Sequence, residues 1–182
     1  YEKMLNVLDR IIKKSNYKFD FIDLGGGMGI PYNKKSKTLN YKKYVFSIKK
    51  ILKKYKSKII FEPGRSIIGN TGVLISKVIY IKPGSKKNFI ILDAAMNDLM
   101  RPALYGAEHE IIPEKKTNQF AGKTYEFVGP ICESTDKFMT SKKFQKLNEK
   151  DLVIISDVGA YGMSLSSNYN IRLKPPEILV KG

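Results

Sequence analysis

The chain lacks the residues on which several common chemistries depend: its 182 residues include one cysteine, one histidine and no tryptophan. One cysteine excludes a disulfide bond within the chain and suits a reducing compartment, so we expect a cytoplasmic protein. One histidine, with no serine in a nucleophile-elbow motif, argues against a Ser/His/Asp hydrolase. The paired Cys/His spacings of a metal site are also missing, so we expect no metal. Without a long apolar run, no transmembrane helix is expected.

Acidic residues are scarce: 17 Asp and Glu stand against 33 Lys and Arg, for a formal net charge of +16. Such a balance is compatible with binding to nucleic acid or to an acidic membrane surface. The excess is mostly lysine, and asparagine and isoleucine are also frequent, a composition that we attribute to an AT-biased genome. Between Leu24 and Phe61 lysines are crowded and no acidic residue occurs. We interpret this segment as a solvated helix face and expect neither nucleic acid nor membrane as a partner.

The first third of the chain alternates between helical and strand patterns. Apolar residues recur at helical spacing over 4–12 and again over 41–55. Each helical segment is followed by a short apolar run, over 19–24 and over 59–61, as in buried parallel strands. Residues 31–40 between them predict a loop. The order helix, strand, helix, strand indicates an α/β barrel or a doubly wound sheet.

After Gly69 the pattern becomes rich in β-strands. Strands are predicted over 73–82, 89–93, 125–128 and 152–156, and a terminal strand near 175–177. A short helix is expected within 98–110, broken near Pro102, and the charged stretch 141–150 keeps a helical pattern. We therefore predict two domains, an α/β part over 1–69 and a β-rich domain over 70–182.

Two motifs close the predicted strands of the α/β part. Gly25, Gly26 and Gly27 follow the first strand, where bare backbone can approach an anion, although a tight turn explains them equally well. The motif Glu62-Pro63-Gly64-Arg65 closes the next strand. In α/β barrels the carboxyl ends of the strands build the site, so both motifs should lie on one rim. For an isolated Glu and Arg, a salt-bridged turn is the alternative.

Three further motifs lie in the β-rich part. Arg101 and Tyr105 are four residues apart and would share one helix face, where an Arg fork and a phenol suit a carboxylate; the alternative is an exposed Arg beside a half-buried Tyr. Cys132 follows Gly-Pro-Ile and precedes Glu133, and its acidic neighbours favour a proton-donating thiol over a thiolate nucleophile. Burial of this cysteine as a small hydrophobe is the alternative. Tyr161, between small residues, could point into a site or pack at a turn. We interpret His109 as structural.

Together these motifs resemble the diaminopimelate decarboxylases, which use pyridoxal 5'-phosphate on an alanine-racemase-like barrel. The specific parts are Met-Arg-Pro-Ala-Leu-Tyr over 100–105 and Gly-Pro-Ile-Cys-Glu-Ser over 129–134. The glycine run and Glu-Pro-Gly-Arg are shared more widely with ornithine and arginine decarboxylases. The similarity runs from about Phe19 to Val180. It implies that residues 1–69 are the last β/α units of an incomplete TIM-type barrel, followed by a β-rich C-terminal domain over 70–182.

The resemblance also implies which residues contact the cofactor. Glu62 would pair with the pyridine nitrogen, and Tyr161 would touch both cofactor and substrate. The cofactor phosphate would be surrounded by Gly25, Gly26, Gly27, Gly64 and Arg65.

For the substrate, the resemblance implies decarboxylation of meso-diaminopimelate to L-lysine, in lysine biosynthesis. A substrate carboxylate would be held by Arg65, Arg101 and Tyr105. Cys132 would donate the proton to the α-carbon, and Glu133 would bind the distal amino group. In this family the last two residues serve the site of the partner subunit, so the resemblance implies a homodimer with shared active sites.

One departure from the family is severe. The lysine that forms the Schiff base with the cofactor lies in the first barrel strand, far upstream of the glycine run, and a cofactor-contacting histidine lies upstream as well. This chain has neither segment and begins at Tyr1 rather than Met, so we expect a fragment that is inactive alone.

Other functions stay open on the sequence. Another amino-acid or carboxynorspermidine decarboxylase is the nearest, although Arg101 and Tyr105 favour a distal carboxylate, since a diamine precursor would need an acidic pocket. A catalytically dead homologue that regulates a full-length partner is a second. A non-catalytic basic binding protein is the third, and a steep salt dependence of binding would reveal it.

Overall fold

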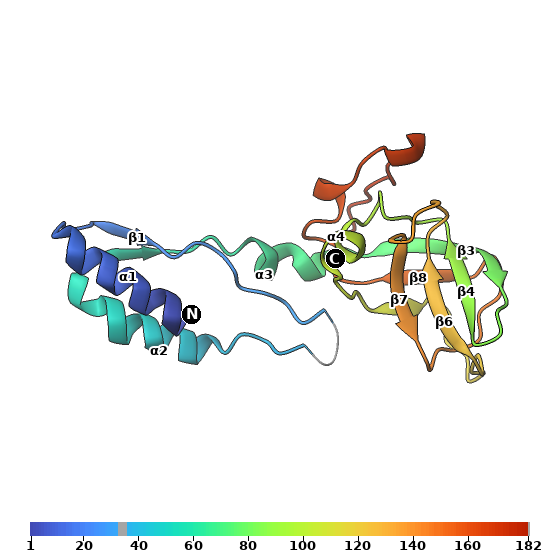
Figure 1. Ribbon diagram of the computed structural model, residues 1–182, viewed down its shortest axis with the longest axis horizontal. Helices are drawn as coiled ribbons and strands as arrows, with labels where there is room; N and C mark the ends of the chain where they lie inside the picture. Colours follow the sequence, from blue (N-terminus) through green and yellow to red (C-terminus); the bar gives the residue numbers. More distant parts are fainter. Residues whose placement is uncertain (33–35, 182) are drawn as a thin grey trace. The chain divides into compact units, whose positions relative to one another are not determined.

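A computed structural model describes residues 1–32 and 36–181, which form two compact units (Figure 1). One unit comprises residues 1–31 and 36–67, and the other comprises Tyr32 and residues 68–181. Each unit has its own hydrophobic core. The predicted loop over 31–40 lies partly outside the described residues. None of the described helices has the length and apolar character needed to cross a membrane.

The first unit packs two helices against a pair of parallel strands. Its elements are α1 (Glu2–Ser15), β1 (Phe21–Asp23), α2 (Tyr41–Leu52) with the 3-10 turn η1 (Lys53–Tyr55), β2 (Lys58–Ile60) and the start of α3 (Gly64–Ile68). β1 pairs with β2 in parallel, with Ile22 opposite Ile59. Helices α1 and α2 lie side by side (Figure 1), and each contributes buried residues to one shared core. The shared core consists of Leu5, Ile12, Ile22, Leu24, Met28, Tyr44, Ile48 and Leu52.

The ends of these two helices follow from local sequence. α1 stops at Asn16, whose φ of 50° is left-handed, a conformation that asparagine tolerates well. α2 starts at Asn40, whose side chain accepts a hydrogen bond from the Lys43 N–H at 3.0 Å. The predicted helices and strands of this unit are therefore confirmed, with ends shifted by a few residues.

The second unit is a six-stranded mixed sheet, which confirms the predicted β-rich domain. Its strands are β3 (Leu74–Lys82), β4 (Lys87–Leu92), β5 (Ile111–Pro113), β6 (Thr124–Val128), β7 (Lys137–Ser141) and β8 (Leu152–Ile155). They lie in the order β5-β8-β3-β4-β6-β7, and among these only the β4–β6 pair is parallel. Short helical segments connect them: α4 (Arg101–Tyr105), η2 (Gly69–Thr71), η3 (Met163–Leu165) and η4 (Tyr169–Ile171).

The core of the second unit lies on the sheet around Phe127, which is fully buried and packs edge-to-face on Phe144 with ring centroids 4.9 Å apart. It continues over Val78, Ile90, Leu92, Ala94, Leu99, Ile111, Tyr125, Phe138, Leu147, Val153 and Ile155.

Three expectations for the second unit are wrong. The stretch 141–150 is not helical, because Phe144 and Leu147 leave the surface and enter the core of the sheet. No strand forms near 175–177, where the described residues have no regular structure. The short helix expected within 98–110 forms as α4, which ends at Gly106 in a left-handed conformation, but the expected break is wrong, because Pro102 lies in its first turn. Strands β5 and β7 and helix α3 were not predicted.

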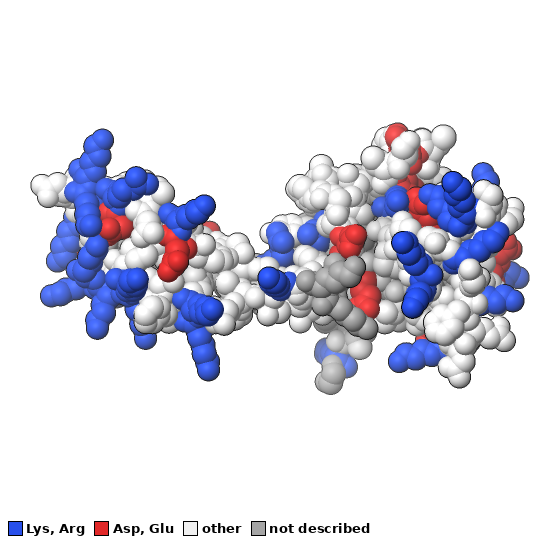
Figure 2. Space-filling model, turned by 60° about the horizontal axis from the view of Figure 1, so that its bottom comes forward, with Lys and Arg blue, Asp and Glu red and all other residues white. Residues whose placement is uncertain are grey.

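Lysine side chains crowd the unit that contains α1 and α2 (Figure 2). Every described lysine between Ser36 and Ile60 is exposed, which confirms the predicted solvated lysine face. In the first unit the carboxylate of Asp9 pairs with Lys13 and with Lys54, at 3.0 and 2.6 Å. These contacts, with a hydrogen bond from the Tyr55 hydroxyl, hold the pKa of Asp9 far below its usual value.

Candidate functional site

The glycine run and the Glu62 motif lie at the same end of the β1–β2 pair. Because these strands are parallel, their carboxyl ends are adjacent. The Leu24 N–H donates to the Ile60 carbonyl at 3.0 Å, and the Glu62 N–H donates to the Gly25 carbonyl at 2.9 Å. A Cβ on Gly26 would lie 2.6 Å from the Glu62 carbonyl oxygen, so only glycine permits this approach. The structure thus brings the two motifs together, as the strand pattern predicts.

The glycine run has the geometry of an anion cradle. Gly25 and Gly27 adopt left-handed φ values of 63° and 85°. The side chain of Asp23 accepts from the Gly25 N–H at 2.7 Å and fixes the start of the turn. In the part of the chain that the structure describes, no protein acceptor contacts the N–H groups of Gly26 and Gly27. Free N–H groups on a left-handed glycine turn fit a phosphate group.

Glu62 and Arg65 follow β2 at the same edge. Glu62 is exposed, and Arg65 is half-buried at the second position of α3. A pyridine ring that carries a phosphate can use a carboxylate at its ring nitrogen and N–H donors at its phosphate. The exposed Glu62 carboxylate and the glycine run provide these two kinds of group.

Arg101 is buried and stacked in the second unit. Its side chain belongs to the first residue of α4 and is 5% exposed. The guanidinium carbon lies 4.3 Å from the centre of the Tyr32 ring, and Nη1 donates to Nε2 of His109 at 2.9 Å. Since Nδ1 of His109 lies 2.9 Å from the Ser156 carbonyl, Nδ1 carries the proton and Nε2 is the acceptor.

The charge of Arg101 has no carboxylate to balance it. No Asp or Glu of residues 1–32 and 36–181 forms an ion pair with this guanidinium. A buried charge without a counter-charge is costly, so the site favours an anionic ligand. Tyr105, at the other end of α4, is 67% exposed. Both residues lie on α4, four positions apart as predicted, but they differ in exposure. The alternative of an exposed Arg beside a half-buried Tyr is wrong, because the Arg is buried and the Tyr exposed.

Neutral His109 makes folding sensitive to mild acid. Burial lowers the pKa of His109 below 6.5; its hydrogen bond to Ser156 opposes this shift, and the charge of Arg101 adds to it. The unfolded chain therefore binds this proton first as the pH falls through 6.5. The free energy of unfolding should decrease over that window by at most about 1.4 kcal/mol per pH unit from this group.

Denaturant unfolding at pH 7.5, 6.5 and 5.5 measures this slope, and His109→Gln, which does not titrate, is the control. The parent and the variant have all other titrating groups in common. The difference between their two slopes of unfolding free energy against pH is therefore the contribution of His109. Equal slopes would contradict a depressed pKa.

Cys132 lies on an exposed loop between β6 and β7. The thiol is free and exposed, so the alternative of a buried small hydrophobe is wrong. Glu133 follows it, and its Oε1 accepts from the Tyr169 hydroxyl at 2.6 Å. A hollow of about 320 Å³ lies next to this loop. It is lined by residues of α4 and by residues between 134 and 140, which follow Cys132 and Glu133 in the chain. The loop thus presents a thiol and an oriented carboxylate together.

Tyr161 lies in a turn that requires small residues. A Cβ on Gly159 would lie 2.0 Å from the Ile68 carbonyl oxygen, so the backbone of this turn packs directly on η2. Tyr161 itself has a left-handed φ of 62° and is 43% exposed. Such a conformation is uncommon for an aromatic residue and is found preferentially at functional sites. Packing at a turn explains why residue 159 is a glycine, but it does not explain why Tyr161 is partly exposed.

The sequence analysis missed the polar residues that support these side chains. His109 was interpreted as structural, yet it orients Arg101. Tyr169 was given no role, yet its hydroxyl holds Glu133. Asp136 was given no role of its own either, yet it is buried beneath the loop that carries Cys132. Its position two residues after the Gly-Pro-Ile-Cys-Glu-Ser motif was the one available signal.

The chain is similar to proteins of known family in sequence and in fold. Residues 6–159 match the family model described as pyridoxal-dependent decarboxylase, C-terminal sheet domain. Diaminopimelate decarboxylase of Neisseria meningitidis serogroup B is 41% identical over 181 residues, which is 100% of this chain and 43% of that protein. The enzyme of Aquifex aeolicus is 38% identical over 180 residues, 99% of this chain and 42% of that protein. The crystal structure of the Helicobacter pylori enzyme complexed with L-lysine matches with a TM-score of 0.81 at 36% identity, covering 95% of this chain and 42% of that one. The chain thus spans less than half the length of these relatives.

Proposed function

The chain belongs to the pyridoxal-dependent decarboxylases with a C-terminal sheet domain, and from this membership we propose that the protein decarboxylates meso-diaminopimelate to L-lysine. The observation that carries the choice of substrate is the buried guanidinium of Arg101, which has no counter-charge among the described residues. A substrate with a second carboxylate would supply that charge. Diaminopimelate has one, whereas ornithine does not.

The proposal includes the surrounding architecture. Residues 1–69 are the last β/α units of a TIM-type barrel, and residues 70–182 are the β-rich domain. The enzyme is a cytoplasmic homodimer, in which Cys132 and Glu133 of one subunit serve the site of the other. The exposure of both side chains supports a role across a subunit interface.

At the first unit, the residues of the glycine edge fit pyridoxal 5'-phosphate. When bound, this cofactor supplies the electron sink for the electron pair that remains as carbon dioxide leaves. Glu62 would hold the proton on the ring nitrogen, and Tyr161 would contact cofactor and substrate. The phosphate would be bound by Gly25, Gly26, Gly27, Gly64 and Arg65. The direct support is that the N–H groups of Gly26 and Gly27 have no acceptor among residues 1–32 and 36–181.

At the second unit, the side chains bind and protonate the substrate. Arg101 and Tyr105 of this unit, together with Arg65 of the first unit, hold a carboxylate, and the Arg fork gives it a fixed orientation. Glu133 binds the distal amino group, already oriented by the Tyr169 hydroxyl. Cys132 donates its proton to the α-carbon after carbon dioxide has left.

The test is release of carbon dioxide by the whole protein, measured in parallel with meso-diaminopimelate, L-ornithine, L-arginine and carboxynorspermidine. Turnover of meso-diaminopimelate alone supports the proposal. A preference for any of the others would assign the protein to a different decarboxylase of the same fold. Absence of turnover from all four, with cofactor bound, would favour a non-catalytic homologue.

A further inference from the structure

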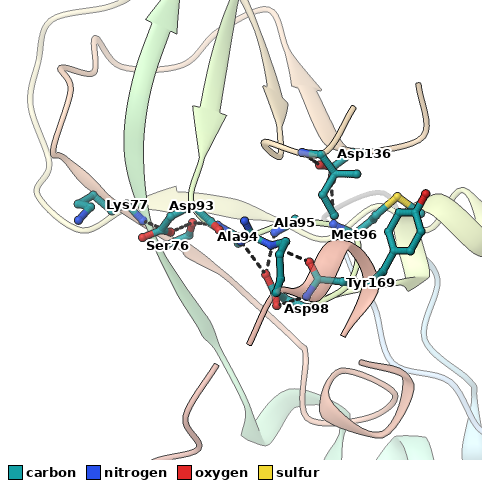
Figure 3. Close-up of polar contacts among 12 residues, drawn as sticks. Ser76, Lys77, Asp93, Ala94, Ala95, Met96, Asp98, Asp136 and Tyr169 are labelled. Atoms are coloured by element: carbon teal, nitrogen blue, oxygen red, sulfur yellow. Dashed lines mark hydrogen bonds and ion pairs between the residues drawn. The ribbon is translucent and has the colours of Figure 1, made fainter. Parts of the chain in front are cut away.

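A buried carboxylate lies directly beneath the loop that carries Cys132. Asp136 is 3% exposed, and its two oxygens have separate partners (Figure 3). Oδ1 accepts from the Met96 N–H at 2.7 Å, and Oδ2 accepts from the Ile131 N–H at 2.8 Å. The carboxylate therefore connects Ile131, in its own loop between β6 and β7, to Met96, 40 residues earlier in the chain.

The same residue closes the loop through its backbone. The Asp136 carbonyl accepts from the Gly129 N–H at 3.0 Å, and the Asp136 N–H donates to the Glu133 carbonyl at 3.1 Å. A Cβ on Gly129 would lie 2.2 Å from Oδ2, so the backbone at this position packs against the carboxylate itself. Cys132, Glu133, Ser134 and Thr135 are exposed above this single buried anchor.

The segment on the other side of Asp136 is itself rigidly held. Asp98, which is buried, accepts from the Ala95 N–H at 2.8 Å and from the Asn97 side-chain amide. Nε of Arg172 donates to Oδ1 of Asn97 at 3.0 Å, which joins the segment to the part of the chain that carries Tyr169 (Figure 3). Met96 is thus a fixed point against which Asp136 can hold the loop.

We propose that Asp136 is a positioning residue, which fixes the Cys132–Glu133 loop by accepting the Ile131 and Met96 N–H groups simultaneously. The catalytic part of this inference rests on the proposed role of Cys132 as proton donor. The anchoring part does not, because it concerns the two hydrogen bonds alone.

The isosteric variant Asp136→Asn separates hydrogen bonding from packing. An asparagine keeps the volume but has one acceptor oxygen, and its NH2 group would face the second backbone N–H. If both hydrogen bonds matter, Asp136→Asn should resemble Asp136→Ala. If the residue only fills space, Asp136→Asn should resemble the parent.

Hydrogen–deuterium exchange of the whole protein measures the anchor directly. Loss of a hydrogen bond to a charged group should accelerate exchange of peptides within 129–137 by about tenfold or more in both variants. Asp151→Asn is the matched control: its carboxylate also accepts a backbone N–H, from Asn148 at 2.7 Å, and lies outside residues 93–98 and 129–137, so exchange should accelerate near Asn148 only. Should Asp136→Ala fail to fold, Asp136→Asn carries the test. Unchanged exchange over 129–137 in Asp136→Asn would overturn the proposal.

The activity arm uses the whole decarboxylase. Misplacement of the thiol should lower kcat by about tenfold or more in Asp136→Asn, while Asp151→Asn stays within about threefold of the parent. Faster exchange with unchanged kcat would reduce Asp136 to a structural role and overturn its positioning of Cys132. If the parent itself does not decarboxylate, the proposed function fails, and the exchange measurement still decides whether Asp136 anchors the loop.

Discussion

Replacing Cys132 with alanine should lower the turnover of meso-diaminopimelate by about 10²–10⁴-fold, the usual contribution of a positioned general acid. The thiol is exposed on a loop whose conformation is set by backbone contacts and by Asp136, so its removal should leave the fold intact. The measurement is steady-state kcat of the purified variant, together with its thermal unfolding. Cofactor binding, which involves the other unit, should not change.

Ser134→Ala is the matched control, because Ser134 is exposed on the same loop and has no proposed role in proton transfer. It should retain kcat within about threefold. Full turnover in Cys132→Ala would mean that the thiol takes no part in the reaction, whatever the family pattern implies.

The same variant tests whether active sites are shared between subunits. Mixing Cys132→Ala subunits with Glu62→Ala subunits should restore activity, because one site of each heterodimer would receive an intact Cys132 and an intact Glu62. If the mixtures stay inactive although each parent folds and dimerises, the cross-subunit role is wrong.

Arg101→Ala should reduce kcat/KM for meso-diaminopimelate by about 30- to 5,000-fold, equivalent to 2–5 kcal/mol for a buried charge-assisted pair. The effect should be large because this guanidinium is buried, oriented by His109 and stacked on Tyr32. No carboxylate of the described chain loses a partner in this variant. The free energy of unfolding should therefore decrease by only about 1–3 kcal/mol, as for one lost hydrogen bond.

Arg101→Lys provides the control for charge. Lysine keeps the positive charge but lacks the planar fork, so it should recover only part of the lost kcat/KM. Unchanged kcat/KM in Arg101→Ala would remove Arg101 from the substrate site. Complete recovery in Arg101→Lys would mean that charge, and not the fork, holds the carboxylate.

Much of the fold was accessible from local patterns. The helices of the first unit follow from apolar spacing and from Asn16 and Asn40 at their ends. The positions of the glycine run and Glu62 follow from two short apolar runs, because parallel neighbours bring their carboxyl ends together. The motifs around Arg101 and Cys132 were also identified, since they consist of consecutive residues.

Features that depend on distant contacts were not accessible in this way. The stretch 141–150 has a helical pattern, but Phe144 and Leu147 gain more by entering the core beside Phe127 than a short isolated helix would gain. Strand β7 is polar and short, and it exists because β6 supplies its hydrogen bonds. Spacing within α4 could not tell which of Arg101 and Tyr105 is buried.

Composition and order along the chain were enough for the α/β and β-rich parts and the exposed lysine face, and the resemblance carried by the motifs pointed to the family and the candidate reactive side chains. The orientation of those side chains required the folded chain. His109 reaches Arg101 across 8 residues, Tyr169 reaches Glu133 across 36 and Asp136 reaches Met96 across 40. Sequence patterns record propensities over a few neighbouring positions. A long-range hydrogen bond forms only where the fold brings a distant donor and an acceptor together and removes the water that would otherwise bind them.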